Sequence, residues 1–209
     1  MLEDIFGHKE AIDLSKSTCH SGGATGSDTY WADLGKIYDV VTRAYSYKTK
    51  NHPIDKVEIS EEDYLEGVDQ VNKANHVLGR FGINKYMNLL ARNWAQVKYS
   101  DQIYAIGYIV EPGGRGKKGY YNKSKYQQID GGTGYAVQMG IQNDKDVFIF
   151  DQTSNKWYQW SYTVFRYKEI DTPIITSLNF AGIGTRDITN EGIEAIENIY
   201  KKTYDEYNK

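Results

Sequence analysis

The sequence predicts an α/β fold with a mostly parallel β-sheet flanked by helices. Short apolar runs rich in Val, Ile and Tyr alternate with longer stretches whose apolar residues recur at helical spacing, and this alternation is typical of parallel strands joined by helices. Residues 102–110 are apolar on both faces, as expected of a central parallel strand. The chain has 209 residues, of which 40% are hydrophobic, and no linker divides it. We therefore expect residues 1–209 to fold as a single domain.

The first half of the chain alternates strands and helices and then becomes mainly helical. Ser60, followed by three acidic residues, is a good N-cap with an acidic first turn, so it marks the start of a helix. A polar loop is expected at residues 48–53. The expected strands are residues 16–20, 38–46 and 102–110, and the expected helices are residues 29–36, 60–80 and 86–97.

The second half begins with a long loop and ends in a strand, a turn and a helix. Residues 111–129 form a basic loop rich in Gly and Tyr, and residues 152–172 contain an aromatic hairpin that adds a small antiparallel extension. In the last helix, apolar residues recur at helical spacing from Ile193 to Tyr200. The expected elements are strands at 146–151, 157–160, 164–168 and 174–181 and helices at 135–142 and 189–207.

The composition excludes several classes of protein. Because 25 Lys and Arg stand against 28 Asp and Glu, the net charge is −3 and nonspecific nucleic-acid binding is disfavoured. Cys19 is the single cysteine, so no intrachain disulfide can form, and no Cys or His spacing indicates a metal site. The sequence lacks a signal-peptide pattern and a long apolar run. We expect a cytoplasmic protein with no cofactor, no metal and no membrane contact.

Tyrosine is unusually frequent, with 19 Tyr against 6 Phe. A tyrosine ring can bury its apolar face and keep its hydroxyl in water, which suits a ligand groove or an interface between copies of the chain. A low-GC coding bias would produce much the same count, so both explanations stay open. The first explanation predicts a homo-oligomer.

Three glycine-rich turns each lie between a predicted strand and a predicted helix. In a parallel sheet all such turns meet at the carboxyl edge of the strands, where ligands bind. Glycine lets backbone N–H groups approach a ligand closely, and the N-terminus of the following helix attracts phosphate. We therefore predict a site for a small phosphorylated ligand. The turns are residues 21–28, 130–134 and 182–187.

Together these turns resemble those of the SLOG superfamily, which unites the LOG phosphoribohydrolases with the Rossmann-like domain of DNA-processing protein A. The similar strings are SGGATGSD at 21–28, GGTG at 131–134 and AGIGTR at 181–186. The resemblance covers most of the chain outside the two insertions and implies a Rossmann-like sheet with a nucleotide-derived ligand at the turns. Familiar members carry the GIGxR turn first, whereas this chain carries it last, so the chain resembles a circularly permuted member.

A second departure from the superfamily concerns catalysis. LOG hydrolases carry a PGGxGTxxE motif whose glutamate helps to cleave an N-glycosidic bond, and this chain has Asp130, Tyr135 and Gln138 at the positions of the proline, the threonine and the glutamate. Gln138 cannot ionise, so it cannot act as a general base. The resemblance therefore implies a binding protein without a catalytic residue, unless Asp130, Asp28 or Glu111 replaces the glutamate.

The candidate binding residues come from the three turns and from an Arg-Asn pair. Arg186 is suited to hold a phosphate through two hydrogen bonds, or it is a surface residue paired with Asp187 or Glu191. The whole set is Ser21, Gly22, Gly23, Gly26, Ser27, Asp28, Arg92, Asn93, Gly131, Gly132, Thr133, Gly134, Gln138, Gly182, Gly184, Thr185 and Arg186.

Other members of this set also have two interpretations. Asp28 either binds ribose hydroxyls or complements the dipole of its own helix. Ser21 and Ser27 either donate to phosphate oxygens or shape the turn through backbone hydrogen bonds. Arg92 and Asn93 lie where related proteins carry an Arg-Asn pair near the ligand, which makes them candidate base or phosphate contacts.

The loop at 111–127 is expected at the binding edge because it directly follows a sheet strand. It concentrates Lys, Arg, Gly and Tyr, and a flexible basic loop with rings can close over an anionic ligand. The alternative is a solvated surface loop, as most charged runs are. The candidate lid residues are Arg115, Lys117, Lys118, Tyr120 and Tyr121.

These observations support three functional hypotheses. The first is non-catalytic binding of a nucleotide-derived ligand, such as a cyclic nucleotide or an ADP-ribose-type signal. Compact, Tyr-rich chains of this kind resemble phage-borne proteins, which implies sequestration of a defence second messenger in the host cytoplasm. The second is a nucleoside 5′-monophosphate phosphoribohydrolase, which Gln138 argues against. The third is a DNA-recombination accessory protein, which the negative charge argues against.

Overall fold

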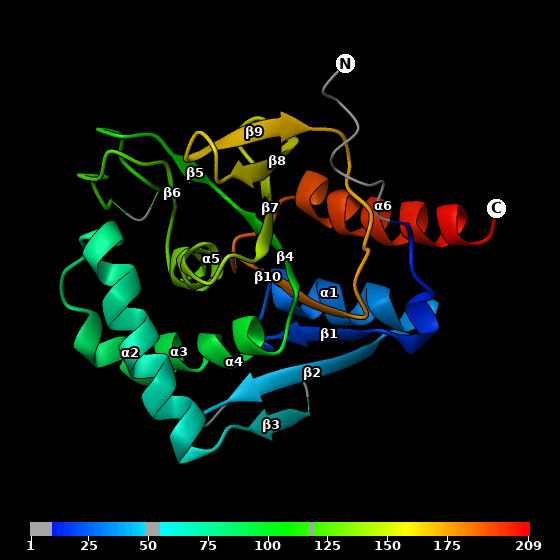
Figure 1. Ribbon diagram of the computed structural model, residues 1–209, viewed down its shortest axis with the longest axis horizontal. Coiled ribbons are helices and arrows are strands. Elements are labelled where there is room, and N and C mark those ends of the chain that lie inside the picture. The colour runs from blue at the N-terminus through cyan, green and yellow to red at the C-terminus, as the bar shows by residue number, and fades with distance from the viewer. Residues whose placement is uncertain (1–9, 49–54, 118) are drawn as a thin grey trace.

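The computed structural model describes residues 10–48, 55–117 and 119–209. Its centre is an eight-stranded sheet in the order β3-β2-β1-β10-β4-β7-β8-β9, with helices on both faces (Figure 1). The strands from β3 to β7 in this order are parallel, and β8 and β9 continue the sheet in antiparallel orientation. The predicted α/β, Rossmann-like fold with a small antiparallel extension is confirmed.

The elements have the following bounds. The strands of the large sheet are β1 (Thr18–Ser21), β2 (Val41–Ser46), β3 (Lys56–Glu58), β4 (Gln102–Gly107), β7 (Asp146–Asp151), β8 (Lys156–Ser161), β9 (Arg166–Ile170) and β10 (Asn179–Gly184). A separate antiparallel pair consists of β5 (Ile109–Val110) and β6 (Gln128–Ile129). The α-helices are α1 (Ser27–Gly35), α2 (Glu61–Leu78), α3 (Met87–Ala91), α4 (Asn93–Lys98), α5 (Thr133–Gln142) and α6 (Asn190–Tyr207). Short 3₁₀ helices are η1 (Leu14–Lys16), η2 (Lys36–Tyr38) and η3 (Ile83–Tyr86).

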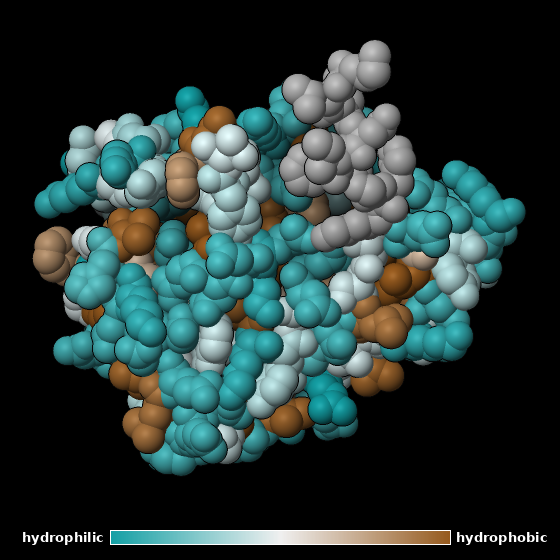
Figure 2. Space-filling model, in the orientation of Figure 1, coloured by the Kyte–Doolittle hydropathy of each residue, from teal (hydrophilic) through white to brown (hydrophobic). Residues whose placement is uncertain are grey.

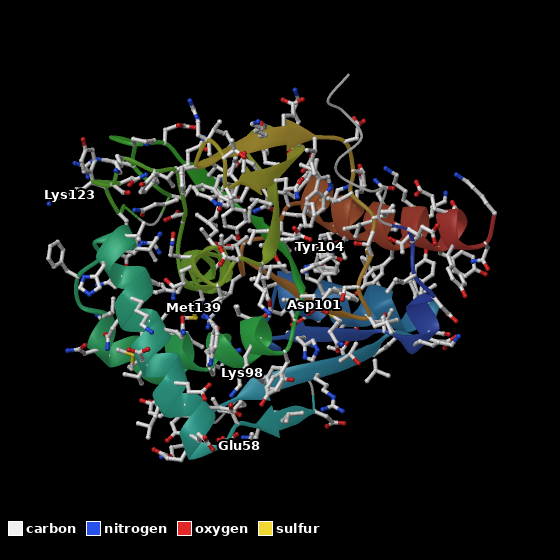
Figure 3. The ribbon with its side chains drawn as sticks, viewed as in Figure 1. Glu58, Lys98, Asp101, Tyr104, Lys123 and Met139 are labelled. Carbon is white, nitrogen blue, oxygen red and sulfur yellow. The ribbon has the colours of Figure 1, made fainter. Side chains whose placement is uncertain are left out.

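The core lies on both faces of the sheet. Helices α1 and α6 pack together on one face, whereas α4 and α5 cover the other and α2 packs outside them. Along β4, Ile103 belongs to the core cluster of α5 and Tyr104 belongs to that of α1 and α6, as the alternation of side chains along a strand requires. Figure 3 shows Tyr104 and Met139 of α5 on opposite sides of β4. The molecular face in Figure 2 is mostly hydrophilic, with small separate apolar groups.

Local sequence signals explain the ends of the long helices. The hydroxyl of Ser60 accepts a hydrogen bond from the backbone N–H of Asp63 at 3.0 Å, and α2 ends at Gly79, whose φ of 62° suits glycine. Thr189 caps α6 by accepting from the N–H of Gly192 at 3.1 Å. These contacts confirm the predicted helices over 60–80 and 189–207.

The last predicted strand is wrong at both of its ends. The strand expected at 174–181 begins only at Asn179 and continues to Gly184, so Gly182 and Gly184 are strand residues and the turn comes later. Residues 174–178 carry the same apolar pattern, but Ile175 is buried against α6, and its N–H donates to the hydroxyl of Thr203 at 2.9 Å. The apolar run at 174–178 therefore indicates burial against α6 and not pairing with a strand of the sheet.

Other elements also differ from the prediction: the strand expected at 38–46 begins only at Val41, after the 3₁₀ helix η2. The helix expected at 86–97 is divided at Arg92 into α3 and α4. The strand expected at 102–110 ends at Gly107, because the chain then turns to form β5 in the small sheet. Strand β3 was not predicted, since its three residues are exposed and carry no apolar pattern. Part of the polar loop expected at 48–53 lies outside the described residues.

The strand order places the last strand at the centre of the sheet. Strand β10 lies between β1 and β4, so β1, β2 and β3 extend to one side and β4 and β7 to the other. Where the strand order of a parallel sheet reverses, the connections on either side run in opposite directions and leave a crevice at the carboxyl edge. Ligands bind in this crevice in such sheets.

Candidate functional site

A cavity of about 520 Å³ opens at the carboxyl end of β10. It is bordered by the N-terminal region of α1, the end of β10, the turn before α5, and the segment from the end of α2 through α4. The cavity thus lies at the predicted edge of the sheet. The candidate residues that line it are Asp28, Arg92, Asn93, Gly131, Gly132, Thr133, Gly184, Thr185, Arg186 and the lid residue Tyr120.

Arg92 carries a buried positive charge at this cavity. It lies at the break between α3 and α4, only 5% of its surface is exposed, and one guanidinium N–H donates to the carbonyl of Tyr45 at 3.2 Å. Its Nε is buried and has no hydrogen-bond partner among the described residues. Burial lowers the pKa of Arg92, the charge of Asp28 raises it, and the positive charge of Arg186 lowers it further. Two guanidinium groups, those of Arg92 and Arg186, therefore line the same cavity.

Gly22 lies behind the cavity lining, against the side chains of Arg92 and Asp28. A Cβ atom at Gly22 would collide with the Arg92 guanidinium and would lie 2.7 Å from the Asp28 carboxylate and 2.9 Å from the Gln96 amide. Glycine is needed here because three polar side chains approach the backbone. The Asp28 carboxylate accepts a hydrogen bond from the N–H of Ala24 at 3.1 Å, so it also holds its own turn together.

Arg80 holds the second glycine turn. Its guanidinium donates to the carbonyl of Gly131 and, at 2.5 Å, to the carbonyl of Ile129. The rings of Tyr120 and Tyr135 each lie 5.4 Å from its guanidinium carbon. Burial lowers the pKa of Arg80, whereas Tyr135, Asp130 and Tyr120 raise it. No signal in the sequence indicates this role, because Arg80 only ends a predicted helix 51 positions before Gly131.

The N-terminus of α5 faces open space at this turn. Gly131 has a φ of 65° and its N–H donates to the Asp130 carboxylate at 2.9 Å. A Cβ added at Gly131 or Gly132 would meet no atom within 4 Å. Gly132 occupies the N-cap position of α5 without a side-chain cap, so the turn presents backbone donors with no side chain in front of them.

Several candidate residues do not line the cavity, and some of them hold the turns in place instead. The hydroxyl of Ser27 donates to the carbonyl of Thr185 at 2.8 Å, and Ser21 accepts from the N–H of Gly23 at 3.4 Å. Gly26, with a φ of 101°, lies against the backbone of Arg186. The residues that do not line the cavity are Ser21, Gly22, Gly23, Gly26, Ser27, Gly134, Gln138 and Gly182.

Gly134, Gly182 and Gln138 have other surroundings. A Cβ at Gly182 would lie 2.6 Å from the Trp31 ring, so this glycine allows close packing of β10 on α1. Gly134 packs in the same way against the carbonyl of Ile129. Gln138 is half-buried within α5.

One ring of the 111–127 loop, that of Tyr120, reaches the cavity, and the described basic side chains of the loop lie near aromatic rings inside and outside the loop. Tyr120 lines the cavity, while the Lys117 ammonium lies 3.8 Å from the centre of the Tyr108 ring and the Arg115 guanidinium 5.7 Å from that of Tyr121. Arg115 and Tyr121 also pair as an isolated β-bridge. Lys118 lies outside the described residues. Figure 3 shows Lys123 at the outer edge of the molecule near the end of α2.

An apolar wall completes the cavity and was not predicted from the sequence. We define the apolar wall as Phe81, Ile83, Tyr86, Leu89 and Tyr120, all of which line the cavity. Three of them, Phe81, Ile83 and Tyr86, come from the connection between α2 and α3, where the sequence shows no long periodic pattern, and Leu89 lies in α3. Their shared location depends on how α2 packs against α3.

A second hollow, of about 410 Å³, lies between the β8-β9 hairpin and α6. It is lined by Glu169, Asp171, Glu191 and Glu194, with Lys156 paired to Glu169 at 2.7 Å. These negative charges would repel an anion. Within residues 10–48, 55–117 and 119–209, no group of three or more His, Cys, Asp or Glu side chains could hold a metal ion. No helix in that part of the chain is long and apolar enough to span a membrane.

Comparison with protein-family models, with curated proteins and with solved structures found no match to this chain. The fold and the cavity therefore define the class: a Rossmann-like α/β protein with a cavity at the carboxyl edge of its central strand.

Proposed function

We propose that the cavity binds a small phosphorylated, nucleotide-derived ligand and leaves it chemically unchanged. The observation that carries this proposal is that Arg92, which is buried, and Arg186, which is exposed, both line the cavity and bring two guanidinium groups to it. An anion placed between two guanidinium groups accepts charge-assisted hydrogen bonds from both.

The remaining features of the cavity agree with a nucleotide in size and chemistry. Its volume of about 520 Å³ falls in the range of roughly 300–1,000 Å³ that is usual for small-ligand sites. The N-terminus of α5 adds uncapped backbone donors at Gly132, which favour phosphate. The cavity also combines this polar end with the apolar wall, as pockets for organic ligands usually do.

Binding without hydrolysis is favoured by the position of the residues that could catalyse it. Gln138 cannot ionise and does not line the cavity. The Asp28 and Asp130 carboxylates, which do line it, accept hydrogen bonds from the backbone N–H groups of Ala24 and Gly131. Both carboxylates therefore already hold the backbone of their own turns.

The resemblance to the SLOG superfamily supports a more specific version of this function. On that basis the ligand is a signalling nucleotide of the cyclic or ADP-ribose type, and the protein acts by sequestering it, as a phage-borne protein would do against a host defence signal. The cavity supports only the binding step of this proposal.

The test uses the purified chain and a panel of nucleoside 5′-monophosphates, ADP-ribose and cyclic nucleotides. Affinity is measured by calorimetry, and the bound and released species are analysed by mass spectrometry after denaturation. Recovery of an intact ligand supports the proposal. Release of free base and ribose phosphate would show a phosphoribohydrolase, and retention of none of the probes would refute the proposal.

The variant Arg186→Gln should weaken binding of the retained ligand about 10- to 100-fold, because a hydrogen bond to a charged group contributes about 1.5–3 kcal/mol. Arg186 is exposed, so the substitution should leave the fold intact. The control is Arg166→Gln, which removes an exposed arginine of β9 that does not line the cavity. Equal affinities for Arg186→Gln and the natural chain would exclude Arg186 from the site.

A further inference from the structure

The apolar wall exposes large side chains to a concave surface. Phe81 is 82% exposed, Tyr86 48% and Tyr120 41%, and all three line the same cavity. Large apolar side chains that gather in one hollow mark a binding surface more often than isolated ones do. No ordinary folding requirement explains them, because these side chains remain largely in water in the folded chain.

The wall and the anion-binding end belong to one continuous site. Leu89 of the wall precedes Arg92 by less than one helical turn, and buried Leu90 lines the cavity between them. Tyr120 joins the wall from the opposite side, where it is stacked on Arg80. A ligand with its phosphate at Arg92 therefore has its other end beside the wall.

The chemistry of the wall favours a flat aromatic group. Two of its rings already have ammonium groups nearby: Lys85 lies 5.0 Å from the centre of the Tyr86 ring and Lys123 lies 5.7 Å from that of Phe81. These ammonium groups place positive charge and hydrogen-bond donors at the edge of the wall, which suits an aromatic ring with ring nitrogens and carbonyl oxygens as acceptors. Stacking of a nucleobase on an aromatic side chain is worth about 1–3 kcal/mol.

We infer that the apolar wall is the subsite for the nucleobase of the ligand, with Phe81 and Tyr86 as the stacking residues. This inference rests on the proposed function and extends it by naming the part of the ligand that residues outside the glycine turns recognise. Because stacking tolerates any base, this subsite distinguishes a nucleotide from a phosphorylated sugar more strongly than it distinguishes one base from another.

The test compares nucleotides with the same molecule lacking its base. AMP, GMP, CMP, UMP and ribose 5-phosphate are titrated into the natural chain and into Phe81→Ala, Tyr86→Ala and Arg186→Gln. Phe81→Tyr retains a ring, and Leu65→Ala removes a side chain that is 60% exposed on α2 and lies outside the cavity. All wall substitutions are at exposed positions, so the fold should survive them; circular dichroism checks this.

We expect the nucleotides to bind at least tenfold more tightly than ribose 5-phosphate. Phe81→Ala and Tyr86→Ala should each weaken nucleotide binding about 5- to 100-fold, leave ribose 5-phosphate unchanged, and abolish the upfield shift of the base protons in NMR spectra. Phe81→Tyr and Leu65→Ala should bind like the natural chain, and Arg186→Gln should weaken every probe.

Two outcomes would contradict the inference in different ways. If ribose 5-phosphate binds as tightly as the nucleotides, and Phe81→Ala changes neither affinity, the wall is not a base subsite. The anion site of the proposed function would still stand. If neither these five probes nor ADP-ribose and the cyclic nucleotides bind to the natural chain, the proposed function and the inference are both overturned.

Discussion

Three arginines at one cavity have different roles because their partners differ. Arg80 donates to two backbone carbonyls and is enclosed by two tyrosine rings, so it fixes the position of the turn before α5. Arg92 is buried. Among the described residues, its guanidinium donates to one backbone carbonyl, that of Tyr45. Arg186 is exposed at the end of β10. The side chain with the most freedom is therefore the one best able to follow a ligand.

His20 supplies a residue-scale prediction about pH. It is 4% exposed on β1, its ring is hydrogen-bonded to the Tyr45 hydroxyl at 2.9 Å and to the Asn179 amide at 3.3 Å, and burial lowers its pKa. In the unfolded chain the pKa is about 6.5. Protonation therefore favours the unfolded state: the stabilisation is fully present above pH 6.5 and is lost as the pH falls from there through the lowered pKa of the folded state.

Urea unfolding at several pH values between 5 and 8 measures this effect. The free energy of unfolding of the natural chain should fall below pH 6.5, and His20→Gln should show a smaller dependence on pH in this range. The control is His76→Gln on α2, which should retain the natural pH dependence. An identical slope for His20→Gln and the natural chain would show that His20 does not couple folding to pH.

At the scale of elements, the close approach of β10 and α1 depends on one glycine. Gly182 lies in β10, and a Cβ at this position would be 2.6 Å from the Trp31 ring and 2.7 Å from the Cys19 sulfur. Trp31 is fully buried, and its indole N–H donates to the carbonyl of Ile183 at 3.2 Å, so the ring cannot move away without losing this bond. The glycine that resembled a ligand-binding residue in the sequence is a packing residue in the fold.

Gly182→Ala should therefore lower the free energy of unfolding by about 1–3 kcal/mol, as overpacking of a core usually does. Gly132→Ala is the matched control, because its backbone is helical and a Cβ there meets no atom within 4 Å. Its effect on stability should stay within about 0.5 kcal/mol. Denaturant titration measures both, and equal stabilities of the two variants would refute the packing argument.

The elements that could be predicted from sequence are those whose ends are defined by neighbouring residues. Helix α2 was predicted because Ser60 and the three acidic residues after it mark the start of a helix within its own sequence. The division of the 86–97 region at Arg92, and the shift of β10 toward Gly184, were not predicted, because they depend on which distant elements these residues pack against.

At the scale of the whole molecule, the last strand and helix complete the fold around the first strand. Strand β10 pairs with β1, and α6 packs on α1, so the C-terminal unit belongs to the centre of the structure. The end of α6 lies near the segment that precedes β1. The pKa of Lys16 in this segment is raised mainly by its hydrogen bond to Asp13 and also by the nearby Tyr207 of α6. Leu14 shares a core cluster with Ile199.

This arrangement predicts that a different cyclic order of the same segments will fold. Joining Lys209 to Met1 and opening the chain between Asp171 and Thr172 would make β10 the first strand while keeping every strand pair of the large sheet. Circular dichroism should show the natural spectrum and a cooperative thermal transition, because one loop closure replaces another. A control opened within β4, between Tyr104 and Ala105, should fail to fold. Failure of both variants would contradict the prediction.

The sequence by itself determined the α/β class, the glycine turns at 21–28 and 130–134 and the caps of the long helices, because periodicity, glycine conformation and capping act between residues close together in the chain. Only the tertiary structure decided which turn residues line the cavity, that Arg80 holds Gly131, and that Phe81 and Tyr86 share a wall with Tyr120. These relations join residues far apart in the chain, and they arise from the packing of α2, α3 and α5, which no local pattern specifies.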